Sequence, residues 1–431
     1  MFRVKALARA AAVPFAKRTY ASAASAPVIS TANGIKVAAV EGDGESQLAS
    51  VSLVIHGGSR FETAETAGAA HFLKAFGFRN TQSRTSFRTV REAELNGASL
   101  TAEATRETIT YTVQCFRDAV PYFVDVLADI ATATKYTEHE FRDIAKTVAF
   151  ESLSARTSPA TRLVDGIHQA AFRTGLGNSL YALPSSPVAT GDAVRQYAQT
   201  ALASNRVAVV ATGVGAQQLA DLVGQSALSM LAPQAPLPAS ASKFVGGTQQ
   251  IYESASPVSH YALAFAAEPA TAPLLASLLG AQKRMKWSTG ISPLAKLAAS
   301  EGIAAEAFSF AYSDAGIAGV LVSAPTAQIK DAVEKVAAVV QKDIATASAE
   351  AVQRAVAAAK LDAAETMATL KGTQLALAQV ALLGQSPVTL ESIETAASKL
   401  SAAAPAVFKS KPVAASVGLS QTTAYVDTLG F

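Results

Sequence analysis

Residues 57–77 read GGSRFETAETAGAAHFLKAFG and mark the passage from a strand into a helix. The stretch just before them, 48–56, reads LASVSLVIH and predicts a buried strand, because it is apolar and rich in β-branched residues. The paired glycines end that strand, and a helix is predicted over 66–77. His71 and Ala75 are four residues apart on this helix, so they share one of its faces.

The rest of the first half predicts further strands and helices in a set order. Residues 28–40 predict a short β-hairpin around the turn dipeptide Asn33-Gly34. A strand is predicted within 100–115, where one face carries Ile109, Tyr111, Val113 and Cys115 and the other carries threonines, which places the cysteine in the core. The other predicted elements are helices at about 118–133, 137–157, 160–173 and 190–203, and a strand at 206–212.

The same order of elements recurs about 200 residues later, which indicates a duplication. Ser386-Pro387-Val388 opens a helix in the second half as Ser186-Pro187-Val188 does in the first. The other recurring elements are a two-strand pattern at 308–323, helices at 326–344 and 346–371, and a strand at 412–418.

The duplication predicts the organisation of the whole chain. Residues 232–248 are rich in Pro, Ala, Ser and Gly and predict a linker between an N-terminal half, 21–231, and a C-terminal half, 249–431. Each half combines hairpins with consecutive helices, which is typical of the α+β class. We therefore expect two related halves, each a mostly antiparallel sheet packed against helices.

The helix over 66–77 resembles the metal-binding helix of the pitrilysin-type peptidases, which are inverted zincins with the signature His-x-x-Glu-His. In that signature two histidines bind zinc and the glutamate polarises the attacking water, while a second glutamate about 76 residues further on completes the site. By this resemblance His71 stands at the first histidine and Glu151 at the distal glutamate. Lys74 replaces the water-polarising glutamate, and Ala75 replaces the second histidine.

These two replacements decide the expected chemistry. One imidazole and one carboxylate are too few ligands for a zinc site, and the Lys74 ammonium would repel Zn²⁺. We therefore expect no catalytic, cofactor-binding or metal-binding residue and no cofactor. His71 is expected to be a packed or hydrogen-bonded histidine, and Glu151 a carboxylate on a helix surface.

Further motifs stand at residues 105–107, 110–118, 168–173, 178–181 and 308–317. They resemble a non-peptidase branch of this family, the second core proteins of mitochondrial cytochrome bc1 complexes. The resemblance implies a structural subunit of ubiquinol–cytochrome c reductase, peripheral on the matrix side of the inner membrane, within a dimeric complex. It also implies core protein 1, cytochrome b and cytochrome c1 as partners, with the redox centres in other subunits.

Two alternatives stay open. The chain also resembles the substrate-binding, non-catalytic subunit of a mitochondrial processing peptidase, but the region comparable to the glycine-rich loop of that subunit, 279–290, has glycines only near its ends. Within it, Lys283, Arg284 and Lys286 lie beside Trp287 and predict either a solvated segment or a contact with an acidic partner or lipid headgroups. The other alternative is a membrane-surface scaffold unrelated to respiration.

Residues 1–20, MFRVKALARAAAVPFAKRTY, differ in kind from the rest of the chain. They hold five basic residues and no acidic one, a composition typical of a mitochondrial presequence, although a basic tail without that role is the alternative. Without this segment the 36 basic residues fall to 31, against 33 acidic ones. The net charge of +3 therefore comes from residues 1–20 rather than from the rest of the chain.

Composition excludes several classes of protein. A single cysteine excludes an internal disulfide, a cysteine zinc cluster and an iron–sulfur site. Half the residues are apolar and 16% are charged, against a usual ~25%, which excludes a disordered chain. The weak net charge gives no reason to expect a nucleic-acid partner. The longest uncharged stretches contain prolines and glutamines, so no transmembrane helix is predicted.

Overall fold

The computed structural model describes most of the chain beyond residue 27. The predicted presequence 1–20, the basic cluster at 283–286 and parts of the predicted linker lie outside the described residues. The described residues are 28–31, 33–41, 47–235, 237, 241–253, 256–280, 290–344, 346–384, 390–419 and 422–431.

The first half is built on a six-stranded sheet in the order β1-β2-β6-β3-β5-β4. The β2 and β6 strands run parallel, and the other neighbouring pairs are antiparallel. The predicted hairpin, the strand at 48–56 and the strand within 100–115 are all confirmed. The strands are β1 (Val28–Ser30), β2 (Lys36–Val40), β3 (Leu48–His56), β4 (Ser99–Ala104), β5 (Thr108–Phe116) and β6 (Val207–Thr212).

The second half is built on a five-stranded sheet in the order β7-β11-β8-β10-β9. It repeats the strands β2-β6-β3-β5-β4 of the first sheet, including one parallel pair, β7 with β11, at the same position. The strands are β7 (Thr248–Tyr252), β8 (Val258–Ala267), β9 (Ala304–Ala311), β10 (Gly316–Pro325) and β11 (Val413–Gly418).

The helices repeat in the same order as the strands. In the first half they are α1 (Ala69–Ala75), α2 (Ser86–Leu95), α3 (Val120–Thr132), α4 (Glu138–Thr157), α5 (Pro159–Phe172), α6 (Gly191–Ala201) and α7 (Ala216–Gln225). In the second half they are α8 (Ala272–Leu279), α9 (Pro293–Glu301), α10 (Ile329–Val339), α11 (Ala349–Met367), α12 (Leu370–Ala378) and α13 (Leu390–Phe408). Two helices follow β3, four follow β5 and one strand then closes the sheet, and the same succession follows β8 and β10. The two halves therefore share one α+β fold, as the duplication predicts, whereas the boundaries at 231 and 249 stay a prediction.

Two helices differ from their predicted extent. α1 begins at Ala69 rather than at residue 66, because Gly68 adopts a left-handed backbone (φ +91°) that ends the preceding turn. The helix predicted over 346–371 is two helices, since Thr369 caps α12 by accepting the backbone N–H of Gly372. A side chain at Gly372 would collide with the Thr366 carbonyl, so the break requires glycine there.

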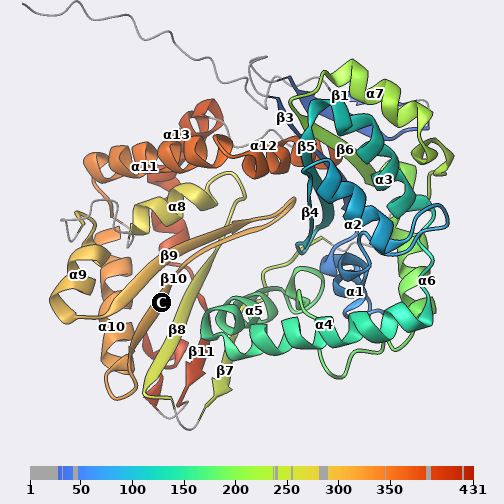
Figure 1. Cartoon of the computed structure of the whole chain (residues 1–431). Helices are drawn as coiled ribbons and strands as arrows, with labels where there is room; N and C mark the ends of the chain where they lie inside the picture. Colours follow the sequence, from blue (N-terminus) through green and yellow to red (C-terminus); the bar gives the residue numbers. More distant parts are fainter. Residues whose placement is uncertain are drawn as a thin grey trace, which may run out of the picture.

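Each half donates one helix to the sheet of the other (Figure 1). α5 packs on β8 and β11 of the second sheet, and α12 packs on β6, β2 and β3 of the first. Since α5 and α12 occupy the same place in the order of elements, the exchange is reciprocal. It covers the second face of both sheets, and for this reason every residue of β6 and of β11 is buried.

The exchanged helices bury apolar stripes at helical spacing. Leu163, Ile167 and Ala171 of α5 form one cluster with Val413 and Ala415 of β11. The corresponding cluster under α12 consists of Ala376, Leu377, Ala378 and Ala381 from the second half with Ala38, Val54, Ala208 and Val210 from the first. Burial of apolar surface stabilises a fold by about 25 cal/mol per Å². These apolar contacts therefore bind the halves into a single packed body.

None of the helices in the described part of the chain combines the length and the apolar character that a membrane crossing needs.

Candidate functional site

The start of α1 is fixed by a half-buried side chain, that of Glu62. The Glu62 side chain accepts the backbone N–H groups of Gly68 (2.9 Å) and Ala70 (2.8 Å), which would otherwise have no partner at the helix end. Burial raises the pKa of Glu62 to about 7, although these two hydrogen bonds lower it. This cap determines which side chains of α1 face α4.

α4 brings the distal carboxylate opposite α1. Nε2 of His71 lies 2.7 Å from Oε2 of Glu151, and Nζ of Lys74 lies 2.5 Å from the same oxygen. The His71 side chain is 2% exposed, Lys74 is 18% exposed and Glu151 is 36% exposed. Three of the four positions singled out in the sequence therefore meet, and Ala75 lies on the same short helix. We name this group the α1–α4 cluster.

His71 is a hydrogen-bonded core histidine, as expected from the sequence. Its Nδ1 accepts the backbone N–H of Ala182 at 3.1 Å, and the ring of Tyr181 stands edge-on to the imidazole with centroids 5.5 Å apart. Burial lowers the pKa of His71 against the opposing effect of the hydrogen bond that it donates to Glu151, and the neighbouring Lys74 charge lowers it further.

Glu151 is more than a surface carboxylate. Burial alone would raise the pKa of its carboxyl group, but the hydrogen bonds from Lys74 and His71 outweigh this effect, and the pKa is lowered. The carboxylate is therefore ionised and held by two donors from α1. The sequence predicts a helix-surface residue and not this pairing, because nothing in the spacing of residues 74 and 151 shows that the Lys74 ammonium reaches the carboxylate.

The zinc ion implied by the pitrilysin resemblance does not fit this group of residues. Only His71 and Glu151 have ligand atoms, and Ala75 offers a methyl group where the signature has its second histidine. No group of three or more His, Cys, Asp or Glu side chains suited to a metal ion occurs within the described residues. No catalytic step can be derived from the α1–α4 cluster, and the assignment of no catalytic or metal-binding residue stays a prediction.

The equivalent place in the second half has a different chemistry. A cavity of about 710 Å³ lies between α8, β9, α11 and α12, and its lining includes Ala276, Ser277, Ala358 and Met367. The charged residues of this lining are Arg354 and Asp362, both on α11. Arg354 donates to the carbonyl of Leu278 at 3.4 Å.

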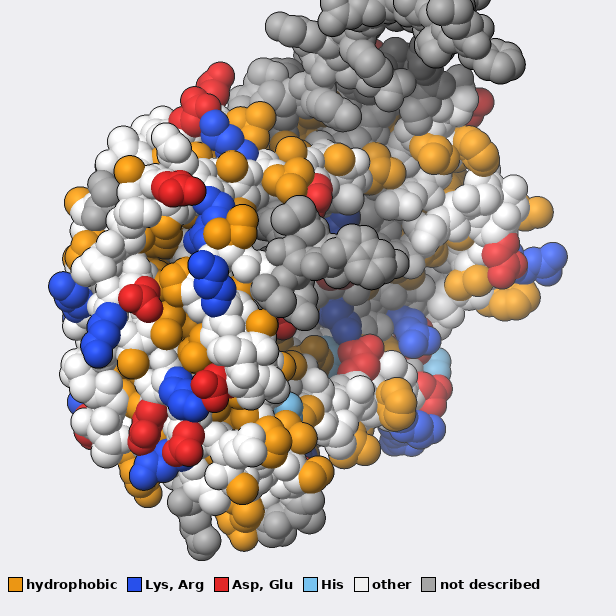
Figure 2. Space-filling model, turned by 90° about the vertical axis from the view of Figure 1, so that its left-hand side faces the viewer, with side chains coloured by type: hydrophobic (Ala, Val, Ile, Leu, Met, Phe, Trp, Pro, Cys, Tyr) orange, Lys and Arg blue, Asp and Glu red, His pale blue; other side chains and the backbone are white. Residues whose placement is uncertain are grey.

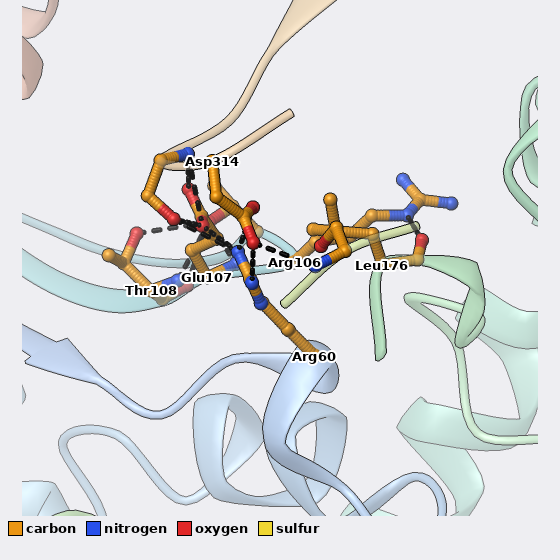
Figure 3. Close-up of polar contacts among 9 residues, drawn as sticks. Arg60, Arg106, Glu107, Thr108, Leu176 and Asp314 are labelled. Carbon is orange, nitrogen blue, oxygen red and sulfur yellow. Dashed lines mark hydrogen bonds and ion pairs between the residues drawn. The ribbon is translucent and has the colours of Figure 1, made fainter. Parts of the chain in front are cut away.

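A buried ionic network joins the two halves at a second site (Figure 3). Arg60, just after β3, donates through Nη1 to Glu107 (2.7 Å) and through both terminal nitrogens to Asp314 (2.8 and 2.6 Å). Asp314 belongs to the turn between β9 and β10, so the contact crosses from one half to the other. Arg60 and Glu107 are 6% and 9% exposed, and the Glu107 carboxylate also accepts the backbone N–H of Ser313 at 3.1 Å. We name these residues the Arg60 junction.

The Arg60 junction also holds the segment between the halves. The Asp314 carboxylate accepts the backbone N–H of Ser242 at 2.9 Å. Burial would raise the pKa of Asp314, but the Arg60 hydrogen bond and charge, together with the Ser242 N–H, keep it below its usual range. Asp314 is therefore a charged centre shared by three parts of the chain.

A second polar group lies beside it on α5. Arg106 donates to Asp165 of α5 at 2.6 Å and to the Leu176 carbonyl at 3.0 Å. Nδ1 of His168 lies 2.6 Å from the Val164 carbonyl and therefore donates, so Nε2 accepts the hydroxyl of Tyr312 at 2.6 Å. Burial lowers the pKa of His168 to about 3 and raises that of Tyr312 to about 12. Both residues are thus neutral partners in a buried contact between the halves.

No separate signal in the amino-acid sequence indicates the Arg60 junction. Arg106, His168 and Asp314 lay inside the motifs that carried the family resemblance, but nothing in their spacing indicated that they meet. The tripeptide Tyr312-Ser313-Asp314, polar between two apolar strand patterns, was the available hint.

Two further expectations concern single residues and surface charge. Cys115 is buried in the core, and burial raises the pKa of its thiol to about 11, so it is unreactive at neutral pH. Figure 2 shows basic and acidic side chains interspersed among apolar ones on the face turned toward its viewer.

Family models match both halves of the chain. The model described as Insulinase (Peptidase family M16) matches residues 37–183, and the model described as Peptidase M16 inactive domain matches residues 189–359. The α1–α4 cluster lies inside the first match, and the Asp314 side of the Arg60 junction lies inside the second.

Curated relatives cover nearly the whole chain. The mitochondrial cytochrome b-c1 complex subunit 2 of Cryptococcus neoformans var. grubii is 35% identical over 93% of this chain and 94% of its own length. The protein of the same name from Yarrowia lipolytica is 33% identical over 92% of this chain and 95% of its own. A probable mitochondrial-processing peptidase subunit alpha-2 of Arabidopsis thaliana is 33% identical, but over 50% of this chain and 43% of its own.

The fold, the altered signature and these similarities agree. Two M16 halves are present, the second matches a model of an inactive domain, and the relatives that span the chain are named as subunits of a complex rather than as peptidases. The chain therefore belongs to peptidase family M16, as a non-catalytic member grouped with the cytochrome b-c1 complex subunit 2 proteins.

Proposed function

We propose that this chain is a structural, non-catalytic subunit of the mitochondrial ubiquinol–cytochrome c reductase complex. The observation that carries the proposal is the identity of 33–35% to proteins named cytochrome b-c1 complex subunit 2, over more than nine-tenths of the chain. The altered zinc signature agrees with it, because a supporting subunit needs the M16 framework but not the M16 chemistry. Electron transfer then belongs to haem and iron–sulfur groups in other subunits.

The proposal extends to partners and place. The chain would pair with core protein 1 and support cytochrome b and cytochrome c1 in a dimeric complex, peripheral to the inner membrane on the matrix side. The basic, acid-free residues 1–20 support import into mitochondria. Exposed apolar side chains such as Phe87, Leu95 and Phe150, at 69%, 82% and 72% exposure, are candidates for burial against such partners.

Purification of the chain from mitochondria with its native partners tests the proposal. Membranes are solubilised in mild detergent, the tagged chain is isolated, and the mass, subunit composition and haem content of the complex are measured. We expect b- and c-type haem in fixed ratio to the chain and loss of ubiquinol–cytochrome c reductase assembly when the chain is depleted. A complex without haem would refute the proposal.

The second candidate is the substrate-binding subunit of a processing peptidase, favoured by the 33% identity to the Arabidopsis protein over half the chain. Cleavage of a presequence peptide by the same purified material distinguishes the two. Cleavage activity that follows the chain through purification, without haem, would support this candidate. Release of the chain by mild salt, without detergent and without respiratory subunits, would instead support a surface scaffold.

A further inference from the structure

The α1–α4 cluster assigns the position of a proton. A backbone N–H can only donate, so the contact between the Ala182 N–H and Nδ1 of His71 leaves a lone pair on that nitrogen. The proton of the neutral imidazole then lies on Nε2, which donates to Oε2 of Glu151 at 2.7 Å. The structure thus specifies the Nε2–H tautomer of His71.

This tautomer is the reverse of the one that a metal needs here. A histidine that binds a metal presents a lone pair to it and donates its other N–H to a carbonyl or carboxylate. In this chain the nitrogen facing Glu151 carries the proton, and the opposite nitrogen is occupied as an acceptor. Coordination through Nε2 would require the loss of the Ala182 hydrogen bond or removal of the one N–H proton of the neutral ring, which leaves an imidazolate.

The positive charge at Glu151 comes from the chain itself. Lys74 donates to the same oxygen at 2.5 Å, and its side chain is only 18% exposed, so the ammonium is held against the carboxylate rather than free in solvent. An ion pair of this kind supplies the charge that a bound cation would supply, without a metal ligand set.

We propose that the α1–α4 cluster excludes divalent metal ions by two independent devices: Lys74 acts as a tethered cation on Glu151, and the Ala182 N–H fixes His71 as a donor toward Glu151. The alanine at position 75 is thus one of three barriers to metal binding, rather than the whole cause of the lost metal site. The proposal concerns the metal implied by the M16 family and does not depend on the proposed function in the respiratory chain.

The tautomer is tested directly on the full chain. Nitrogen-15 labelling of histidine, with correlation of ring nitrogens and carbon-bound protons, identifies which nitrogen of His71 carries the proton; His71→Gln assigns the signal. We expect the proton on Nε2. A proton on Nδ1 would overturn the second device, whatever the metal content of the chain.

Metal binding is tested with Zn²⁺ alone as the probe, by dialysis and elemental analysis of three forms of the full chain. The unchanged chain should bind no zinc. The double variant, Lys74→Glu with Ala75→His, restores the order of the signature, and the triple variant adds Ala182→Pro to it. We expect the double variant to bind zinc at least tenfold more weakly than the triple variant. The proline removes the N–H that holds Nδ1. One zinc per unchanged chain would refute the proposal, as would equal affinity of the double and triple variants. If the triple variant does not fold, the nitrogen-15 experiment decides the second device.

The tethered cation has its own test. Lys74→Met should increase amide exchange in α1 and in the middle of α4 at least tenfold, and Lys74→Arg should restore protection. Lys335→Met is the matched control, because Lys335 donates to Glu301 at 2.6 Å with both side chains well exposed. Equal effects of Lys74→Met and Lys335→Met would remove Lys74 from the proposal.

Discussion

α5 and α12 are equivalent helices, yet each binds the opposite sheet in its own way. Both bury an apolar stripe against a fully buried strand, β11 or β6. α5 adds a buried polar contact with the second half, His168 to Tyr312, next to the Arg60 junction, while Asp165 of α5 pairs with Arg106 of its own half. α12 adds Gln374, which donates to Ser50 at 2.5 Å, and the exposed pair of Lys371 with Glu103. Both halves thus exchange a helix, whereas the buried ionic network of the Arg60 junction lies next to α5.

The largest effect is expected from removal of the cation at the Arg60 junction. Arg60→Met leaves the Glu107 and Asp314 carboxylates close together without their partner, and breaking a buried ion pair in this way costs about 3–5 kcal/mol. Chemical denaturation of the full chain measures the loss. Lys335→Met is the control, since exposed pairs contribute about 0–1 kcal/mol. A loss below about 1 kcal/mol for Arg60→Met would show that the buried charges near α5 add nothing to the unfolding free energy.

The next effect compares the apolar stripes themselves. Ile167→Ala in α5 and Leu377→Ala in α12 each remove a fully buried side chain, and each should cost about 2–5 kcal/mol in unfolding free energy. We expect similar values and a single unfolding transition, because both helices bridge the halves. A much smaller loss for Leu377→Ala, or two separate transitions, would show that α12 is only loosely bound.

Acid should weaken the α5 side more than the α12 side. The pKa of His168 is lowered to about 3 by burial, so protonation favours the unfolded chain, where the pKa is about 6.5. The contribution of His168 is complete above pH 6.5 and falls as the pH decreases toward 3, by about 2 kcal/mol at pH 5. His168→Gln should remove this part of the pH dependence of unfolding. An unaltered slope for His168→Gln would contradict the buried neutral state.

The smallest effect is expected at the exposed pair under α12. Nζ of Lys371 lies 2.6 Å from Oε1 of Glu103, but the two side chains are 73% and 52% exposed, so solvent screens the pair. Lys371→Met should change the unfolding free energy by less than about 1 kcal/mol. A larger loss would mean that the charge on α12 matters as much as the charge near α5, and the contrast between the helices would then disappear.

The sequence predicted the elements whose pattern is strong and missed those without one. The strand at 48–56 is predicted closely because its run of apolar and β-branched residues is buried almost throughout, and α5 is predicted to within one residue at each end. α2 was missed, since its large apolar side chains, Phe87 and Leu95, face solvent rather than a core. α11 and α12 were joined, because alanine-rich helices give little periodic contrast.

The candidate site shows the same limit at the level of single atoms. Positions 71, 74, 75 and 151 could be read from the family pattern, and their loss of ligands was visible as residue types. The hydrogen bond from Ala182 could not be predicted, because a backbone N–H leaves no trace in the amino-acid sequence. Likewise, Arg60 and Asp314 are 254 positions apart, and they meet because the two halves pack against each other.

The exchange of helices also sets the order in which the protein can be completed. β6 ends at residue 212, yet the face that carries Ala208 and Val210 is covered by α12, which begins at residue 370, and by Ala381 just after it. A chain that emerges from a ribosome, or from a membrane pore, therefore exposes an apolar strand until most of its second half has followed. Such delayed burial makes partly synthesised chains prone to aggregation. For this chain, a binding protein that shields β6 during synthesis or import would matter more than one that acts on the finished fold.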